Sequence, residues 1–373
     1  MIEFFVLFAF TAVFFQIAAV LVLRIGLNRA IRSHASDRCG MLPALSVVIA
    51  VKNEANNLAP LLDAIAQQDY PNAEVLFVDD GSTDGTREVL QAFALRKPNV
   101  RIVQTKSEHR KRLNGKKAAL QTGIEAAKHD LLVFTDGDCW PQDVDWLKRF
   151  GESFNAGAEV VVGTGLYLPS AHVHSRCYAS ETIRVSAMYH AAVGLGMPYM
   201  CVGRSMGYTR PAFIRSGGFD AHPQLPSGSD DLLLQTFTPG TVICACPSAV
   251  TFSKPPVSLS DWLHQKKRHL GSAPLYPPVV KGGLVLYDCT LLLMPLVVVF
   301  AAWIGGMVML VLLSLLVIRT LLSASNFQSI KNLAGRHESL SQLWCWEYPA
   351  SWLNALISIA SIWKKEKAWK NDQ

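Results

Sequence analysis

The fold is decided by residues 45–54, which read LSVVIAVKNE. The first seven of these residues form a continuous apolar run, which is typical of a strand that is buried on both faces of a sheet. The polar group Lys52-Asn53-Glu54 follows at the point where the strand ends. Parallel sheets bind ligands at the carboxyl ends of their strands, so this boundary predicts the edge of a site as well as a strand.

The same pattern recurs along the chain outward from this stretch. The residue pattern predicts further strands at 74–78, 100–103 and 131–134, and helices at 56–67, 84–95 and 116–128. This alternation predicts an α/β domain with a mostly parallel sheet between helices. Polar groups again follow the strands, Asp79-Asp80-Gly81-Ser82 after the second and Asp136-Gly137-Asp138 after the fourth.

The carboxylates that follow these strands favour a ligand-binding site. Taken singly, each group also fits a turn or a helix cap, but their order at successive strand ends favours a site. Asp136 and Asp138 are two residues apart, so on an extended segment their side chains project the same way. Such oxygen ligands suit Mg²⁺ or Mn²⁺, which would stabilise a departing diphosphate. The chain has neither a P-loop motif nor G-x-G-x-x-G after the first strand, which argues against a P-loop site and a dinucleotide cofactor.

Composition indicates a partly membrane-embedded chain. Of 373 residues, 50% are hydrophobic and 17% are charged, whereas soluble domains average about 25% charged. These values exclude a disordered chain and a small disulfide scaffold. The net charge of +6 is mild and its basic residues lie beside apolar segments, so no nucleic-acid partner is expected. The eight cysteines are scattered and supply no paired zinc motif, which favours reduced thiols.

Two apolar segments are long enough to cross a bilayer. Residues 2–23 carry one charge and match the length of about 20 residues that a spanning helix needs. Arginines follow at once, so the positive-inside rule places the next segment in the cytoplasm. Residues 284–318 are interrupted by Pro295, Gly305 and Gly306. They predict two membrane helices that meet near Gly305-Gly306, with Arg319 returning to the cytoplasm.

These segments give a domain division. We expect an anchor helix at 1–24, a cytoplasmic domain at 41–275, a membrane helix pair at 276–320 and a short apolar helix with a basic tail at 343–373. The last helix is either interfacial or membrane-spanning, since tryptophans flank it but a crossing would leave the lysine-rich tail outside. The chain is therefore expected in the inner cell membrane, crossing it more than once, with its catalytic domain cytoplasmic.

Residues 46–54, 78–84 and 135–138 together resemble the inverting glycosyltransferases of the GT-A fold, glycosyltransferase family 2. This is the family of cellulose, chitin and hyaluronan synthases and ceramide glucosyltransferase, and the resemblance covers about residues 43–275. It implies a GT-A nucleotide-diphospho-sugar transferase domain with a nucleotide-sugar donor. Residues 114–120, NGKKAAL, are similar to a family segment whose lysine reaches the nucleotide. The residues that the resemblance implies for binding the nucleotide sugar on this side are Lys52, Glu54, Asp79, Asp80, Lys116 and Asp136, with Asp136 and Asp138 holding Mg²⁺ or Mn²⁺.

The acceptor side carries a second set of similar motifs. Residues 203–208 and 216–220 look like the stretch that precedes the family's catalytic carboxylate, and 229–234, SDDLLL, resembles its acidic pair. That likeness implies Asp231 as general base with Asp230 beside it. Residues 265–269, QKKRH, resemble the Q-x-x-R-W element, with His269 where the family has Trp. Gln265, Arg268 and His269 are thereby expected at the diphosphate and acceptor site. A basic amphipathic helix on anionic lipid is the alternative interpretation of this segment, and the two are compatible.

The function expected from these residues is inverting sugar transfer. The donor is a nucleotide diphosphate sugar, by default a UDP-sugar, and the acceptor is a hydroxyl of a lipid or lipid-linked sugar at the membrane. Addition of one or a few sugars is favoured over polymer synthesis because few membrane segments are predicted. Two alternatives remain at this stage, a sugar nucleotidyltransferase and a non-catalytic membrane sensor or transporter of nucleotide sugars.

Overall fold

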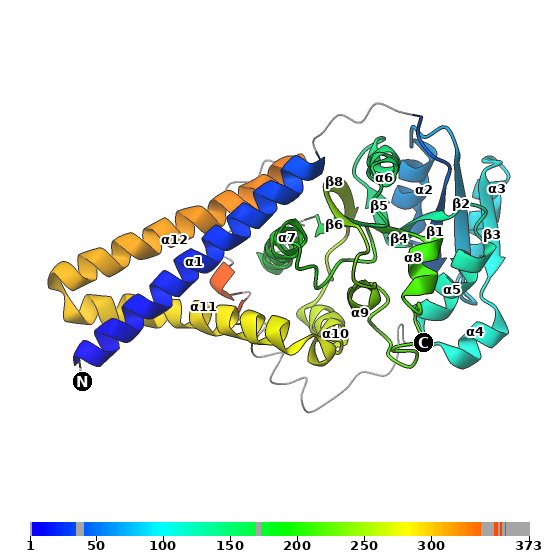
Figure 1. Cartoon of the computed structure of the whole chain (residues 1–373). Helices are drawn as coiled ribbons and strands as arrows, with labels where there is room; N and C mark the ends of the chain where they lie inside the picture. The colour runs from blue at the N-terminus through cyan, green and yellow to red at the C-terminus, as the bar shows by residue number, and fades with distance from the viewer. Residues whose placement is uncertain are drawn as a thin grey trace.

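The computed structural model describes residues 2–34, 41–168, 173–336, 347–349, 351–352 and 355. An α/β body carries three long helices that extend together to one side of it, with the N-terminus at their far tip (Figure 1). The helices of the body are α2 Leu58–Ala66, α3 Thr86–Ala94, α4 Ser107–Arg112, α5 Lys116–Ala126, α6 Trp146–Asn155, α7 Val173–Gly194, α8 Arg210–Arg215, α9 Asp231–Thr236, α10 Leu259–Leu270 and the short η1 Ala273–Leu275. The long helices are α1 Ile2–His34, α11 Pro278–Ile304 and α12 Gly306–Leu333.

Within the described residues, the body is built on one sheet of eight strands in the order β3-β2-β1-β4-β7-β6-β8-β5. β3, β2, β1 and β4 are parallel to one another, as the alternating pattern predicts, and β7 runs antiparallel to both β4 and β6. The strands are β1 Leu45–Val51, β2 Ala73–Asp79, β3 Val100–Gln104, β4 Leu131–Asp136, β5 Cys139–Pro141, β6 Val160–Tyr167, β7 Met206–Thr209 and β8 Ile243–Ser253.

The register of the parallel strands sets where the polar groups meet. Val51 lies opposite Asp79 on β2, and Ala50 lies opposite Asp136 on β4. The carboxyl ends of β2, β1 and β4 therefore reach the same edge of the sheet. All seven residues of β1 are buried, which accounts for a run of apolar side chains that continues until the chain reaches this edge.

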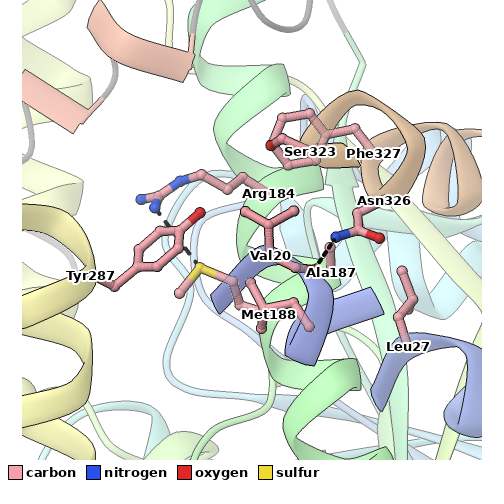
Figure 2. A pocket seen from close by; sticks show the side chains of 10 residues that line it. Val20, Leu27, Arg184, Ala187, Met188, Tyr287, Ser323, Asn326 and Phe327 are labelled. Carbon is pink, nitrogen blue, oxygen red and sulfur yellow. Dashed lines mark hydrogen bonds between the residues drawn. The ribbon is translucent and has the colours of Figure 1, made fainter. Parts of the chain in front are cut away.

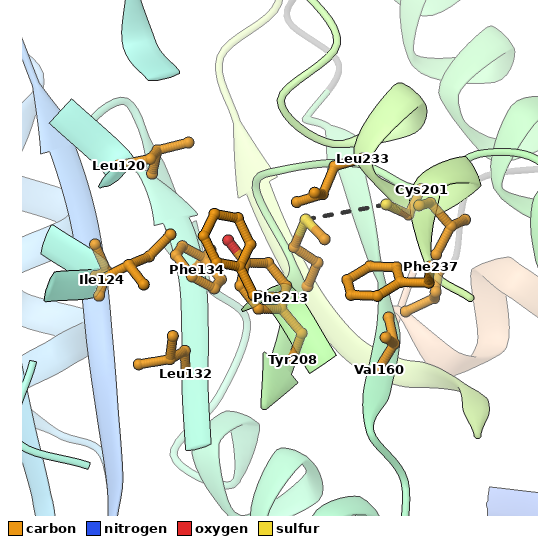
Figure 3. Close-up of a cluster of buried hydrophobic side chains, with 14 of the residues drawn as sticks. Leu120, Ile124, Leu132, Phe134, Val160, Cys201, Tyr208, Phe213, Leu233 and Phe237 are labelled. Carbon is orange, nitrogen blue, oxygen red and sulfur yellow. Dashed lines mark hydrogen bonds between the residues drawn. The ribbon is translucent and has the colours of Figure 1, made fainter. Parts of the chain in front are cut away.

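The core on one face of the sheet is aromatic. Phe134 of β4 stacks on Tyr208 of β7 with ring centroids 4.4 Å apart, and Tyr208 stacks in turn on Phe213 of α8 (Figure 3). On the same face α5 approaches β1 and β2 so closely that a Cβ on Gly123 would lie 2.4 Å from a methyl carbon of Val48. This dense packing fixes α5, and with it the first residue of that helix, Lys116, against the strand ends.

Among the described residues, three helices are long and apolar enough to cross a membrane: α1, α11 and α12. α11 and α12 meet where Gly305 and Gly306 both adopt positive φ, at 69° and 58°, a conformation that favours glycine. Pro295 lies inside α11 without ending it. The helix pair thus joins where the sequence predicts.

Two helix ends differ from the predicted boundaries. α1 continues past residue 24 to His34, and α12 continues past residue 320 to Leu333. Arg319 does not mark a return to water, because it is fully buried within α12 and its guanidinium binds both carboxylate oxygens of Glu347, at 2.7 and 2.9 Å. The Gln16 side chain of α1 accepts further hydrogen bonds from Arg319. Most of the predicted C-terminal helix and tail, 343–373, lies outside the described residues.

The body and the long helices are joined through α1 and α7. A Cβ on Gly194 of α7 would lie 2.0 Å from the carbonyl oxygen of Gly26, and a Cβ on Gly26 would lie 2.3 Å from that of Ala191. The two helices therefore touch backbone to backbone. Beside this contact, a cavity of about 10 Å³, enough for one water molecule, is lined by Val20, Leu27, Arg184, Tyr287 and Asn326 among others (Figure 2).

Replacing Gly194 with Ala should destabilise the protein, although Ala is the better helix former by about 1 kcal/mol. The added methyl has no room against Gly26, so α1 must move away from α7. Thermal unfolding in detergent, followed by tryptophan fluorescence, should show a lower midpoint. Gly283→Ala is the matched control, because a Cβ there meets nothing within 4 Å. An equal or higher midpoint for Gly194→Ala would contradict the contact.

Breaking the Arg319–Glu347 pair from one side should cost more than removing it whole. Loss of one partner of a buried ion pair leaves an uncompensated charge, typically at about 3–5 kcal/mol. Arg319→Leu should therefore lower the unfolding midpoint further than the double variant Arg319→Leu/Glu347→Leu. If the double variant is less stable than the single one, the unpaired Glu347 carboxylate is not what destabilises Arg319→Leu.

Candidate active site

Asp136 and Asp138 flank the turn between β4 and β5. Asp136 is the last residue of β4, residues 137–138 form the turn and Cys139 begins β5. The expectation that both carboxylates lie on one extended segment is therefore wrong. The turn nevertheless brings a carboxylate oxygen of each aspartate and the Cys139 sulfur within 4.8 Å of one another.

This group has donors that fit a divalent cation. Two carboxylates at a partly exposed turn match the preference of Mg²⁺ and Mn²⁺ for oxygen, and leave room for phosphate oxygens and water. A Cβ on Gly137 would lie 2.9 Å from Val51 and 3.1 Å from the Glu54 Cγ. Glycine at this position thus lets the turn lie directly against the loop that follows β1.

The loops after β1 and β2 are tied together by side chains. The backbone N–H of Asn53 donates to the Ser82 hydroxyl, and the Asn53 side chain accepts from Thr83 N–H at 2.9 Å. Asn53 has a φ of 53°, which Asn tolerates better than most residues. Glu54 is buried, with its carboxylate accepting from the Asn57 side chain at 2.9 Å. Lys52 is half-buried at the start of this loop.

Asp79 and Asp80 have different surroundings. Asp79 is almost fully buried, and its carboxylate accepts from Ser82 N–H at 2.9 Å and from Gln104 at 2.7 Å. It therefore shapes the loop from inside. Asp80 is paired with Arg110 of α4 at 3.0 Å, and the same guanidinium lies over Gly81. Arg110 is a cation at the predicted nucleoside site that the motif search did not identify.

Lys116 lies between the two acidic groups of the site. Its ammonium is paired with Asp136, and a Cβ on Gly203 would lie 3.4 Å from the Lys116 Nζ and 3.3 Å from the Asp230 Oδ2. Burial acts to lower the pKa of Lys116, but the charges of Asp136 and then Asp230 outweigh it and raise that pKa above its ordinary value. Lys116 is thus a fixed positive charge between the D-x-D turn and the second acidic pair.

Asp230 and Asp231 lie at the N-terminus of α9 and face different partners. Asp230 accepts from the backbone N–H of Gly203 at 2.8 Å, within the stretch 203–208. Asp231 is buried, and its Oδ2 accepts hydrogen bonds from the Tyr276 and Ser272 hydroxyls. Burial, and then the neighbouring Asp230 carboxylate, raise the pKa of Asp231 to about 6.

α10, which carries Gln265, Arg268 and His269, is anchored on the body. The Tyr167 hydroxyl donates to Gln265 at 2.7 Å, and Lys266 pairs with the buried Glu181 of α7. Trp262 stacks on Tyr178 at 4.7 Å, and Ser258 and Asp261 form a capping box at the start of the helix. Arg268 is half-buried and the His269 side chain is exposed. The helix therefore has a buried anchoring face, which a purely lipid-bound amphipathic helix would lack.

Besides Arg110, the sequence motifs missed three groups at this site. Arg204 stacks over the Tyr167 ring at 4.8 Å and donates to Ser253 at 2.9 Å, within a stretch recognised only as acceptor-side. Ser272 and Tyr276 contact the Asp231 carboxylate from the segment between α10 and α11. Neither lies in a motif, and no spacing within the sequence indicates which carboxylate they reach.

Two family models match the chain. Glycosyl transferase family 2 matches residues 46–179, and Glycosyl transferase family group 2 matches residues 144–353, more than half of the chain. The glycosyltransferase AglE of Haloferax volcanii is 39% identical over 197 residues, 51% of this chain and 59% of the relative. A dodecaprenyl-phosphate galacturonate synthase of Rhizobium johnstonii is 36% identical over 123 residues, 32% of this chain and 35% of the relative. The matches thus span about a third to three fifths of these curated relatives.

One solved structure shares the fold over its whole length. The mannosyltransferase PcManGT from Pyrobaculum calidifontis, in complex with GDP-Man and Mn²⁺, superposes with a TM-score of 0.57 at 19% identity, covering 98% of this chain and 100% of that one. A likeness at this identity concerns the fold alone. The predicted class, a GT-A α/β domain with helices at both ends that are long enough to span a membrane, is confirmed.

Removing one of the two turn carboxylates should weaken Mn²⁺ binding. Asp138→Asn should lower the affinity by about tenfold or more, since even residues behind a metal ligand typically affect affinity by that much. Isothermal titration of purified protein with Mn²⁺ in the presence of UDP measures this directly. Asp63→Asn, on the exposed face of α2, is the control and should bind as the wild type does. Equal affinity in all three proteins would place the cation elsewhere.

Proposed function

The chain belongs to glycosyltransferase family 2, and we propose that it is an inverting glycosyltransferase that moves a sugar from a nucleotide diphosphate sugar to a hydroxyl of a lipid or lipid-linked acceptor. The observation that carries this proposal is the arrangement of two acidic groups about Lys116. The Asp136–Asp138 turn lies on one side and Asp230, beside Asp231, on the other. This arrangement could hold a diphosphate beside Asp136 and Asp138 and an acceptor beside Asp231.

Asp231 is proposed as the general base. Its buried carboxylate has a pKa raised to about 6, which keeps it ionised at neutral pH yet basic enough to take a proton. As the acceptor oxygen attacks the anomeric carbon, its proton moves to Asp231 and the bond from that carbon to the diphosphate breaks. Because attack comes from the face opposite the leaving group, the configuration at the anomeric carbon is inverted.

Positive charge near Asp136 and Asp138 is proposed to assist departure of the diphosphate. Asp136 and Asp138 would hold Mg²⁺ or Mn²⁺, which neutralises the charge that develops on the leaving group. Lys116 is held in place by Asp136, and Arg268 lies on α10 beside His269. Fixed cations in a cleft stabilise a departing oxyanion without having to reorganise. Glu54, Asp79 and Asp80 would form the nucleoside side, with Asp79 acting through the shape of its loop.

A lipid-borne acceptor is supported by where the base lies in the chain. Both hydroxyls that bind Asp231 come from the segment just before α11, a helix apolar enough to span a membrane. The relative that is a dodecaprenyl-phosphate galacturonate synthase is named for a lipid-linked phosphate. Arg24, Arg29 and Arg32 at the body-side end of α1 are proposed to place the body in the cytoplasm by the positive-inside rule, at the inner cell membrane.

Turnover by detergent-purified protein tests the proposal. Nucleotide sugars of each common base should be offered with a membrane lipid extract, with and without Mn²⁺ or Mg²⁺. We expect release of a nucleoside diphosphate and a new glycolipid in which the anomeric configuration of the donor is inverted. Asp231→Asn should reduce this by about 10²–10⁴-fold, the usual contribution of a general base, whereas Asp63→Asn should not.

Other outcomes would identify other functions. Release of inorganic diphosphate from a nucleoside triphosphate would indicate a sugar nucleotidyltransferase. Binding of a nucleotide sugar with no product from any lipid fraction would support a sensor and contradict transfer. Full activity in Asp231→Asn would leave sugar transfer standing but exclude this residue as the base.

A further inference from the structure

The contacts around the Asp231 carboxylate are unequal on its two oxygens. Oδ2 accepts from the Tyr276 hydroxyl at 2.7 Å and from the Ser272 hydroxyl at 2.5 Å. Oδ1 accepts from the backbone N–H of Leu232 at 2.8 Å. Ser272 is 1% exposed and Tyr276 8% exposed, so neither hydroxyl has easy access to water as an alternative partner.

We propose that Ser272 and Tyr276 are positioning residues that saturate Oδ2 of Asp231 and so make Oδ1 the atom that receives the proton of the acceptor hydroxyl. The inference rests on the proposed function, since it concerns the base of that reaction. It adds two residues that no motif contains, and it assigns the proton transfer to one atom.

The assignment follows from counting lone pairs. An ionised carboxylate has about four acceptor positions, two on each oxygen. Among the described residues, Oδ2 receives two donors and Oδ1 receives one. The fourth position, on Oδ1, is therefore the one left for the acceptor hydroxyl.

Ser272 can also respond to the state of the base. Its single hydroxyl proton has two acceptors within reach, Asp231 Oδ2 and the carbonyl oxygen of His269 at 2.8 Å. While Asp231 is ionised, the charge makes the carboxylate the stronger acceptor. After Asp231 has taken the proton, the serine can turn to His269 and remain satisfied. Tyr276 has no such alternative among the described residues, so its hydroxyl is expected to have the larger effect on the base.

The Ser272 and Tyr276 hydroxyls lower the pKa of Asp231, whereas burial and Asp230 raise it. Burial and Asp230 destabilise the charged form of Asp231, whereas donors to its oxygen stabilise it. Lys116 and Lys117 of α5 and the Cys201 thiol also act on this acidic pair, Lys116 through Asp230. Lys117 is held by the carbonyl oxygens of His222 and Leu225, which keeps its charge close to the base.

The positioning residues also connect the base to the membrane. Ser272 lies two residues after the end of α10, and Tyr276 lies two residues before the start of α11. The Tyr276 ring packs edge-on against Tyr199 at 6.1 Å. The segment that leads into a membrane helix thus sets the orientation of the base toward an acceptor approaching from that side (Figure 1).

The pH dependence of kcat/KM tests the positioning role. Removing the hydroxyl in Tyr276→Phe withdraws a hydrogen bond from a charged acceptor, so the acid limb of the profile should move upward by about one pH unit. Ser272→Ala should shift it in the same direction but by less, because the serine shares its proton. Tyr199→Phe removes a neighbouring hydroxyl that does not bind Asp231 and should leave the limb unchanged. An acid limb that stays at the wild-type pH in both Tyr276→Phe and Ser272→Ala overturns the proposal.

Unfolding midpoints between pH 4 and 8 give a readout that needs no substrate. A carboxylate whose folded pKa lies above its ordinary value of 3.8 stabilises the fold below that value, and the stabilisation is lost as pH rises to about 6. Relative to Asp231→Asn, the wild type should therefore lose stability over this window. Tyr276→Phe should extend the loss to higher pH, and this extension should vanish when Asp231→Asn is added.

The two readouts separate the failure of the inference from that of the proposed function. If no donor and acceptor give turnover but the unfolding series behaves as described, the hydrogen bonds hold Asp231 as inferred and the reaction is wrong. If turnover occurs with Asp231 as base but Tyr276→Phe changes neither the profile nor the unfolding series, the positioning role is wrong and the function stands.

Discussion

The rest of the site depends on how negative charge is held at one edge of the sheet. β2 and β4 end in aspartates, and two more lie at the N-terminus of α9. Their mutual repulsion would destabilise this edge unless donors or cations compensated it. The compensating partners differ from one carboxylate to the next. Asp79 is bound by backbone and amide donors, Asp80 by Arg110, Asp136 by Lys116 and Asp231 by two hydroxyls. Because Asp231 is bound by neutral donors and, among the described residues, by no direct ion pair, it is the member of the set that is suited to accept a proton.

The site is built from distant parts of the chain. Strand register aligns the first acidic residues, since a parallel sheet brings its carboxyl ends to one edge. The partners of Asp231 come from the far side of the domain, where α10 is fixed by Gln265 on Tyr167 and by Lys266 on Glu181. The same segment continues into α11, and α1 returns to the body through its contact with α7. The three long helices and the site residues are therefore parts of one packed unit.

Local pattern was sufficient to predict the first parallel strands, the helices between them, and the sheet edge where acidic residues gather. β1, β2 and β4 are buried on both faces of the sheet, so each is a nearly continuous apolar run that pattern alone identifies. The polar residues after each run indicate where the strand reaches the edge of the sheet. Pattern failed where a single long-range contact decides the structure. Arg319 looks like a helix end in the sequence, but α12 continues past it with the guanidinium buried against Glu347 and Gln16. Ser272 and Tyr276 could not be assigned for the same reason, because their role depends on a carboxylate some 40 residues earlier in the chain.

A structure of the wild-type protein with Mn²⁺ and a non-hydrolysable nucleotide-sugar analogue tests the central claim most directly. The account predicts the diphosphate beside Asp136 and Asp138, with Oδ1 of Asp231 on the opposite face of the sugar from that diphosphate. A nucleotide bound away from the ends of β1, β2 and β4, or a sugar that Asp231 cannot reach, would contradict it.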